Sequence, residues 1–433
     1  MSFVQNIACA IRMSSKRAAI AVTIGILLGW LFKEPTNDRP SQGTVHSGLM
    51  EVKNIFDDIL HHEREGIALA AYHNDEIIVD LWGGYADRSA DRLWEHDTMT
   101  VTFSTTKAIA ALIVAIFVSR QQLHYDDLVI KYWPEFGQHG KQNVTIQWIL
   151  EHKVGLLRFE KEIELEKAND HVYISHLIEE SKPLWPPGTQ CAYHAITQGW
   201  LIDQILRRVD TKKRGIGQFY REEIQPLMKD RDFYIGLPRL LHYRMAYIAQ
   251  STNIEFMKAC LLSKRYYLFA WNAILSGENL MNIACNYPTW MSVMAPKMPY
   301  NNPKVREVEN VAALGIGTAR GLAAVASAII KNNLISEEVW ELLSKPTEYV
   351  FDRTIKSYVL RGHGFFYDRH PTRKDAFLLT HPGHGMQKIT IDPITKTTIA
   401  FIRNLIRWDE ASFQAIDRIT YQLMDKIDRQ HIN

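Results

Sequence analysis

A serine and a lysine stand three residues apart at the head of an apolar run, VTFSTTKAIAALIVAIF (residues 101–117). If the run is a helix, Ser104 and Lys107 project from the same face, one turn apart. A hydroxyl loses its proton during attack on a carbonyl, and a lysine amine can take that proton only while neutral, a state that burial favours. The pattern also fits a helix that Ser104 merely caps, with Lys107 in solvent. Because residues 108–118 are almost wholly apolar, we expect a buried helix, and a lysine at its start then needs a reason.

Two later stretches carry further groups able to move protons. WPPGTQCAYHAITQGWLI (185–202) places Tyr193 between a Pro-Gly turn and a helical run, and LLTHPGHGMQKITID (378–392) places His381 at the end of an expected strand. Phenol and imidazole side chains both serve as general acids or bases. Tyr193 taken alone also fits an ordinary core tyrosine, so the pattern gains its meaning from the order of all three motifs.

The order S-x-x-K, Y-x-A and H-x-G resembles that of the serine β-lactamase and penicillin-binding-protein superfamily, specifically its class C-like esterase branch. Further stretches resemble successive landmarks of that branch, and the resemblance covers about residues 47–405: IIVDLWGGYAD (77–87), LHYDDLVIKYWPEF (123–136), TIQWILEHKVGL (145–156) and ALGIGTARGLAAV (313–325). The resemblance implies an α+β, β-lactamase-like fold: an antiparallel five-stranded sheet flanked by helices, with a mostly helical second subdomain.

The resemblance also implies roles for the motif residues. Ser104 would be the acylated nucleophile and Lys107 its proton partner. Tyr193 would act as a second acid/base group, as a phenolate helped by Lys107, first on Ser104 and then on the deacylating water. His381 stands where the family has the lysine of K-T-G, and could hydrogen-bond to Tyr193 or to a substrate oxygen.

The same resemblance places the carbonyl-binding groups. The backbone N–H groups of Ser104 and His384 would form the oxyanion hole. Gly383 would allow the chain to pass close to the substrate. No metal site and no cofactor are implied.

Two departures from the family pattern bear on the substrate. Ala195 replaces an asparagine that helps hold the amide side chain of the drug in true lactamases of the superfamily, and Pro382 replaces a hydroxyl-bearing residue of K-T-G. The sequence therefore predicts a serine hydrolase that cleaves a small-molecule ester or amide through an acyl-enzyme, more an esterase than a β-lactamase. A non-catalytic or weakly catalytic scaffold or filament-forming protein that kept the fold is the alternative.

The elements that would position these residues come from both ends of the chain. Apolar residues at helical spacing predict helices over 47–62 and 409–427. Alternation and turn residues predict five strands: GIALAAYH (66–73) and EIIVDLWGGY (76–85) around Asn74-Asp75, then DAFLLTH (375–381), QKITID (387–392) and KTTIAFIR (396–403). We expect one β-lactamase-like domain over 46–433, with an α/β part at about 46–130 and 346–433 and a helical part at about 131–345.

The amino terminus differs from the rest. Basic residues precede AAIAVTIGILLGWLF (18–32), and no acidic residue comes before Glu34. We expect residues 1–45 to be an apolar anchor or targeting segment with a linker, meeting a membrane through residues about 16–33. The charge asymmetry predicts a single-pass protein with a lumenal or extracellular catalytic domain. A mitochondrial presequence and a buried amino-terminal helix are the alternatives.

Composition excludes several other classes of function. Lys and Arg outnumber Asp and Glu by only 50 to 48, and the charges are interspersed, so nucleic acid is not an expected partner. The four cysteines form no CxxC pair, which fits neither a zinc site nor a dense disulfide framework. The histidine-rich stretches HHERE (61–65) and RGHGFFYDRH (361–370) lack regular ligand spacing, and we read them as solvated or structural.

Overall fold

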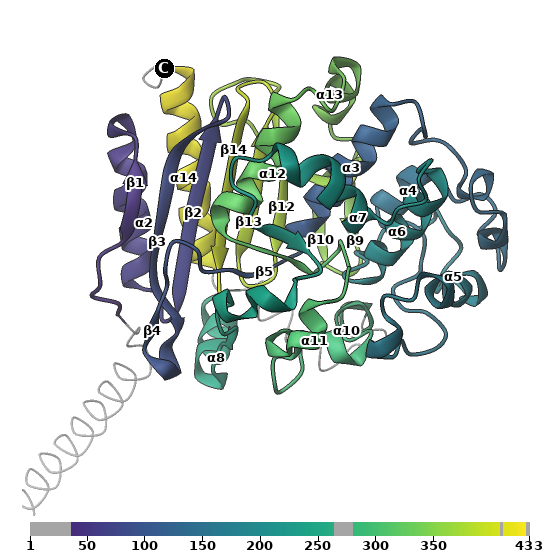
Figure 1. Ribbon diagram of the computed structural model, residues 1–433, viewed down its shortest axis with the longest axis horizontal. Helices are drawn as coiled ribbons and strands as arrows, with labels where there is room; N and C mark the ends of the chain where they lie inside the picture. The colour runs from purple at the N-terminus through teal and green to yellow at the C-terminus, as the bar shows by residue number, and fades with distance from the viewer. Residues whose placement is uncertain (1–35, 264–279, 408–409, 430–433) are drawn as a thin grey trace, which may run out of the picture.

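A ten-stranded antiparallel sheet forms the centre of the protein in a computed structural model that describes residues 36–263, 280–407 and 410–429 (Figure 1). The five strands that the sequence predicts lie side by side in its middle, in the order β3 (Glu76–Asp87), β2 (Gly66–His73), β14 (Thr397–Arg403), β13 (Gln387–Asp392) and β12 (Phe377–Gly383). Figure 1 shows amino-terminal and carboxy-terminal strands next to each other, β2 beside β14. The predicted antiparallel sheet, built from both ends of the chain, is confirmed.

Five short strands, which the sequence pattern did not predict, extend this sheet at its two sides. On the β3 side they are β1 (Gln42–Val45) and β4 (Arg92–Leu93). Beyond β12 they are β11 (Phe365–Arg369), β10 (Ser357–Gly362) and β9 (Glu348–Asp352).

Both faces of the central sheet are covered by helices. Residues of β2 alternate between two apolar clusters: Leu69 packs with α2 (Met50–His61) and α14 (Glu410–Asp428), whereas Ala70 belongs to the cluster that contains α3 (Thr106–Ser119) and α12 (Ala319–Lys331). A strand buried on both faces has this pattern because successive side chains point to opposite sides. The helices predicted over 47–62 and 409–427 are α2 and α14.

Helix α3 runs through the largest apolar cluster. Every side chain from Thr106 to Val118 is buried, which is the environment expected for a helix that is apolar all round. The predicted buried helix is therefore present, and it carries Lys107 at its first turn.

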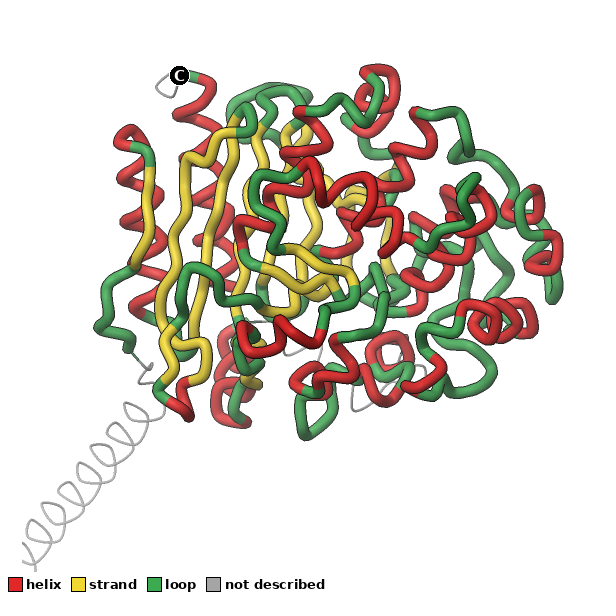
Figure 2. The backbone as a smooth tube through the Cα atoms, viewed as in Figure 1, coloured by secondary structure: helices red, strands yellow, loops and turns green. Residues whose placement is uncertain are grey.

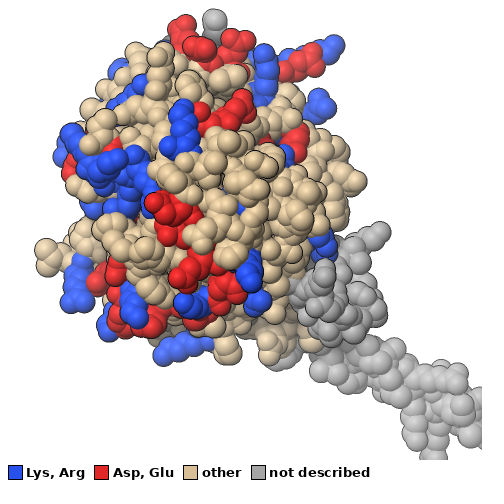
Figure 3. Space-filling view, turned by 90° about the vertical axis from the view of Figure 1, so that its right-hand side faces the viewer, with Lys and Arg blue, Asp and Glu red and all other residues tan. Residues whose placement is uncertain are grey.

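The segment between the two halves of the sheet is mostly helical, and much of it lies to the right in Figure 2. Its helices are α4 (Ile146–Leu150), α5 (His171–Glu180), α6 (Thr197–Val209), α7 (Ile216–Phe219), α8 (Asn253–Leu262), α10 (Leu280–Cys285), α11 (Pro303–Arg306) and α13 (Glu337–Leu343). A small sheet joins β5 (Thr100–Phe103), β8 (Gly315–Gly317) and β6 (Phe233–Ile235), and β15 (Leu405–Ile406) pairs with β7 (Ala249–Gln250). On the face in Figure 3, positive and negative side chains are interspersed.

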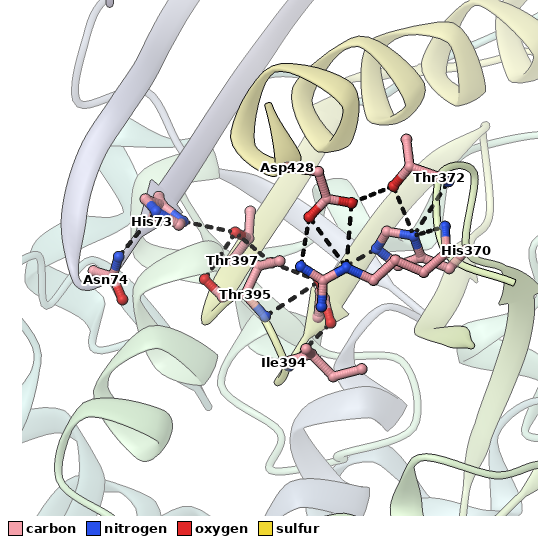
Figure 4. A network of polar contacts seen from close by, with 10 residues as sticks. His73, Asn74, His370, Thr372, Ile394, Thr395, Thr397 and Asp428 are labelled. Carbon is pink, nitrogen blue, oxygen red and sulfur yellow. Dashed lines mark hydrogen bonds and ion pairs between the residues drawn. The ribbon is translucent and has the colours of Figure 1, made fainter. Parts of the chain in front are cut away.

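A polar network fastens α14 to the end of the sheet at which β13 ends and β14 begins (Figure 4). His73 Nδ1 lies 3.0 Å from Thr397 Oγ1 and so links β2 to β14. Arg373 Nε donates to Asp428 Oδ1 at 3.1 Å, which joins the segment before β12 to the last turn of α14. The candidate active site lies at the other end of these strands, where β12 ends at Gly383 and β13 begins at Gln387.

The predicted membrane localisation needs correction. Among the described residues, no helix has both the length and the apolar character required to cross a bilayer. Helix α3 illustrates the physical reason: it is almost wholly apolar, but its 14 residues span only about 21 Å and pack inside the domain. The predicted anchor, residues 16–33, lies outside the described residues. The single-pass placement is thus contradicted by the helices that the structure describes.

Candidate active site

The serine of the S-x-x-K motif lies in a tight turn between β5 and α3. Phe103, the residue before it, has a φ of +47°, a left-handed conformation that a bulky residue rarely adopts. The Thr105 hydroxyl donates to the carbonyl oxygen of Thr102 at 2.9 Å, and the Thr106 hydroxyl donates to that of Phe103 at 2.5 Å. These bonds hold the turn so that Ser104 stays partly exposed between buried neighbours. Strained turns of this kind occur mainly at functional sites, where the surrounding structure maintains them.

Lys107 points back toward Ser104 from the first turn of α3. Its Nζ atom lies 3.4 Å from Ser104 Oγ and donates hydrogen bonds to the carbonyl oxygens of Ala195, at 2.7 Å, and Ala312, at 2.8 Å. Burial lowers the pKa of Lys107 well below its usual value. A neutral amine has two N–H groups, which the two carbonyls accept, and one lone pair, which is left facing the Ser104 hydroxyl. This arrangement suits a base.

Tyr193 completes a cluster with Lys107 and Ser104. The Lys107 Nζ atom lies 4.7 Å from the centroid of the Tyr193 ring. Burial raises the pKa of Tyr193 above its usual value, and a hydrogen bond with Ser104 opposes that rise only in part. The phenolate that the resemblance implies is therefore not the favoured resting form, because burial stabilises the neutral phenol.

His381 also lies in this cluster, near the end of β12. The centroid of its ring is 6.1 Å from that of Tyr193 and 5.0 Å from that of Phe366. Its Nδ1 atom lies 2.9 Å from the carbonyl oxygen of Pro382, which can only accept, so Nδ1 carries the hydrogen and Nε2 is an acceptor. Burial lowers the pKa of His381 to about 3. The histidine is therefore neutral where the family pattern has a lysine.

Gly383 allows β12 to end against the nucleophile turn. A Cβ atom at this position would lie 2.7 Å from the carbonyl oxygen of Thr102 and 3.0 Å from Thr105 Cγ2, so a larger residue would push the strand away. The next residue, His384, packs its ring on that of Phe103 with 5.5 Å between the centroids. The segments that carry the backbone N–H groups of Ser104 and His384 are thus adjacent, and their pairing as an oxyanion hole remains a prediction.

Gln387, to which no sequence motif pointed, holds these two segments together. Gln387 is the first residue of β13 and is fully buried. Its amide nitrogen donates to the carbonyl oxygen of Val101 on β5 at 3.0 Å. Only the pairing of Gln387 with Gly383 in the sheet brings it to the nucleophile turn, so the motif pattern gives no signal for it.

A buried ion pair fixes the segment that carries Tyr193, and no sequence motif pointed to it either. Asp352 accepts a hydrogen bond from the backbone N–H of Tyr193 at 3.1 Å. It also forms an ion pair with Arg361 at 2.7 Å. Arg361 also donates to the carbonyl oxygen of Glu151 at 3.0 Å and to Cys191 Sγ at 2.8 Å. Three segments far apart in the sequence meet here: the one that carries Glu151, the one that carries Cys191 and Tyr193, and the β9–β10 pair. No local pattern identifies them as neighbours.

Two neutral histidines pack behind Tyr193. The His152 ring lies 4.5 Å from the Tyr193 ring, and its Nδ1 atom accepts from the backbone N–H of His194 at 3.1 Å. His194 donates from Nδ1 to the carbonyl oxygen of Ala192 at 2.7 Å and accepts at Nε2 from the N–H of Leu156 at 3.0 Å. Burial lowers the pKa of both rings, that of His194 to about 4. In the part of the chain that the structure describes, no group of three or more His, Cys, Asp or Glu residues could hold a metal ion.

Two curated relatives of this chain have the word esterase in their names. The chain is 27% identical over 379 residues to the esterase/β-lactamase LipL of Mycobacterium tuberculosis (strain ATCC 25618 / H37Rv), an alignment that covers 82% of each chain. A shorter stretch of 108 residues, 24% of this chain and 27% of the relative, is 36% identical to the esterase EstB of Burkholderia gladioli.

Solved structures show the same fold. A penicillin-binding-protein homologue from Caulobacter crescentus superposes with a TM-score of 0.71 at 28% identity, over 87% of this chain and 98% of the other. A family VIII carboxylesterase gives a TM-score of 0.71 at 23% identity, over 88% and 99% of the two chains. The model of the Beta-lactamase family matches residues 52–420. The resemblance read from the three motifs is confirmed: this chain belongs to the Beta-lactamase family and is a serine hydrolase of its esterase-related branch.

Proposed function

We propose that the protein is a carboxylesterase that cleaves small-molecule esters through an acyl-enzyme on Ser104. The observation that carries the proposal is the setting of Lys107, whose two carbonyl partners leave its lone pair toward Ser104 Oγ. A buried lysine with a lowered pKa is an ordinary way for a protein to provide a base at neutral pH.

In the acylation step, Ser104 Oγ attacks the ester carbonyl carbon while Lys107 takes the hydroxyl proton. The backbone N–H groups of Ser104 and His384 stabilise the negative charge that develops on the carbonyl oxygen. Tyr193 then donates its phenolic proton to the leaving oxygen and is reprotonated by Lys107. The products of this step are the free alcohol and an acyl-enzyme, with Lys107 neutral and Tyr193 a phenol again.

Deacylation repeats these proton transfers with water in place of the serine. Lys107 and Tyr193 together accept a proton from the attacking water and return one to Ser104 Oγ as the acyl bond breaks. A carboxylic acid is released, and the resting site is restored. The proposal needs no metal ion and no cofactor.

Three features of the site favour an ester over a β-lactam. Ala195 contributes its backbone carbonyl to Lys107 but has no side-chain amide for a drug. Pro382 has neither a hydroxyl nor an N–H group to offer. His381 is neutral, since its pKa is lowered to about 3, so it provides no cation for the carboxylate of a β-lactam.

We therefore expect that the protein will hydrolyse nitrocefin at a kcat/KM at least ~10²-fold below its kcat/KM for p-nitrophenyl acetate, because one missing charge-assisted contact alone costs about 10-fold or more. Both rates are measured by absorbance on the same preparation. The double variant His381→Lys with Pro382→Thr restores the K-T-G pattern and should narrow this gap. Nitrocefin turnover equal to ester turnover would contradict the preference for esters.

A further inference from the structure

A cleft of about 580 Å³ opens between strands β9–β12 and helix α14. Its size lies in the range of small-molecule sites, about 300–1,000 Å³. The residues that line it include Tyr358, Phe366, Pro382, His384, Phe413 and Gln414. They come from β10, β11, β12, the following turn and α14.

The cleft adjoins the candidate active site through the residues that the two share. Gly383 and His384, which border the expected carbonyl-binding position, are part of its wall. Phe366, another wall residue, has its ring centroid 6.2 Å from that of Tyr193 and 5.0 Å from that of His381. A group that leaves the reacting carbonyl on the Tyr193 side would therefore enter this cleft.

The wall is mainly apolar and aromatic. At the outer end, Tyr349 and Tyr358 are 67% and 59% exposed, with their rings stacked at 5.2 Å, which leaves two large aromatic surfaces in contact with water. Pro382 adds an apolar ring to the wall.

The one buried charge of the wall is compensated. Lys388 is 4% exposed, and its Nζ atom lies 2.7 Å from both Asp368 and Asp417. The lysine already has two carboxylate partners, so the cleft does not need an anionic ligand to neutralise it. This chemistry suits an apolar group, aromatic or branched, better than a charged one.

We propose that this cleft binds the alcohol portion of the ester substrate, and that this alcohol carries an aromatic or bulky apolar group. The inference rests on the proposed esterase function. It assigns the alcohol rather than the acyl portion because Tyr193, the group that protonates the leaving oxygen, is in contact with Phe366 of the cleft wall. Apolar contacts made by this portion lower the barrier to acylation and have no influence on deacylation, in which the alcohol has already left.

The test compares ethyl acetate with 2-phenylethyl acetate, whose alcohols have similar reactivity and which give the same acetyl-enzyme. The wild type is expected to favour 2-phenylethyl acetate in kcat/KM by at least ~10-fold, the usual effect of burying one aromatic side chain. Gln414→Trp fills the cleft from an exposed position on α14 and should lower this preference at least ~5-fold. Arg418→Trp is the matched control, because Arg418 is exposed one turn further along α14 and does not line the cleft.

The outcomes separate the two proposals. If ethyl acetate and 2-phenylethyl acetate are both hydrolysed but the preference is absent, or is unchanged in Gln414→Trp, the assignment of the cleft is wrong and the esterase proposal stands. If Gln414→Trp instead alters the preference between ethyl acetate and ethyl phenylacetate, the cleft holds the acyl portion, which also overturns the assignment. If the wild type hydrolyses no ester, the proposed function fails first and the inference fails with it.

Discussion

Lys107→Ala will lower kcat/KM for p-nitrophenyl acetate by at least ~10²-fold, the usual effect of removing a positioned proton-transfer group. The loss is expected because Lys107 Nζ lies 3.4 Å from Ser104 Oγ, and the carbonyls of Ala195 and Ala312 hold it there. Stopped-flow or steady-state absorbance measures the rate, and circular dichroism checks that the variant is folded.

Lys107→Arg is the informative control for this prediction. Arginine keeps a positive charge but cannot be deprotonated in a protein, so it should lose activity as the alanine variant does. The pH profile gives a second readout: the lysine must be neutral, so kcat/KM falls as the pH is lowered through its pKa. Because burial lowers the pKa of Lys107, wild-type activity should persist well below the ordinary pKa of a lysine. Activity of Lys107→Arg within a few fold of wild type would remove Lys107 from the mechanism.

Tyr193→Phe will lower kcat/KM for ethyl acetate by at least ~10²-fold. The substitution keeps the ring that packs against His152 and His381 and removes only the hydroxyl, so folding should be little affected. The raised pKa of Tyr193 keeps a proton available for the departing ethoxide oxygen, which is a poor leaving group without one.

The leaving group offers a control within the same variant. p-Nitrophenolate departs readily without a proton, so the loss on p-nitrophenyl acetate should be smaller than the loss on ethyl acetate. Equal losses on the two esters would show that Tyr193 does not act as the acid for the leaving group. Wild-type rates on both would exclude it from the chemistry altogether.

The sheet was predictable where both of its faces are buried in a regular pattern. β2 and β14 are mostly apolar, and their apolar residues alternate between two clusters, while α2 and α14 repeat apolar residues at helical spacing. The edge strand β9 and its neighbour β10 were not predictable, because exposed tyrosines and charged residues interrupt their pattern. Their pairing depends on neighbouring strands rather than on their own sequence.

The residues of the candidate site that belong to sequence motifs were predictable. Ser104, Lys107, Tyr193 and His381 lie together, as the resemblance implied. The groups that position them were not predictable. Asp352 accepts a hydrogen bond from the backbone N–H of Tyr193, which is 159 residues away in the sequence, so only the folded chain reveals the contact.

The protonation states of Tyr193 and Lys107 could not be predicted from the sequence either. Motif comparison suggested a phenolate at Tyr193, whereas burial favours the phenol there and a neutral amine at Lys107. These two forms contain the same number of protons as the phenolate with a charged lysine. The difference lies in desolvation, which depends on packing around the site and has no signature in the motif.

The central claim is that Ser104 is the nucleophile, and labelling with a fluorophosphonate probe followed by intact-protein mass spectrometry tests it most directly. We expect the wild type to gain the mass of one probe, and Ser104→Ala, folded to the same extent by circular dichroism, to gain none. Pre-incubation with a slowly hydrolysed ester should protect the wild type. A folded wild type that takes up no probe, or a Ser104→Ala variant that is labelled equally well, would contradict the account and favour a scaffold that has kept the fold without its chemistry.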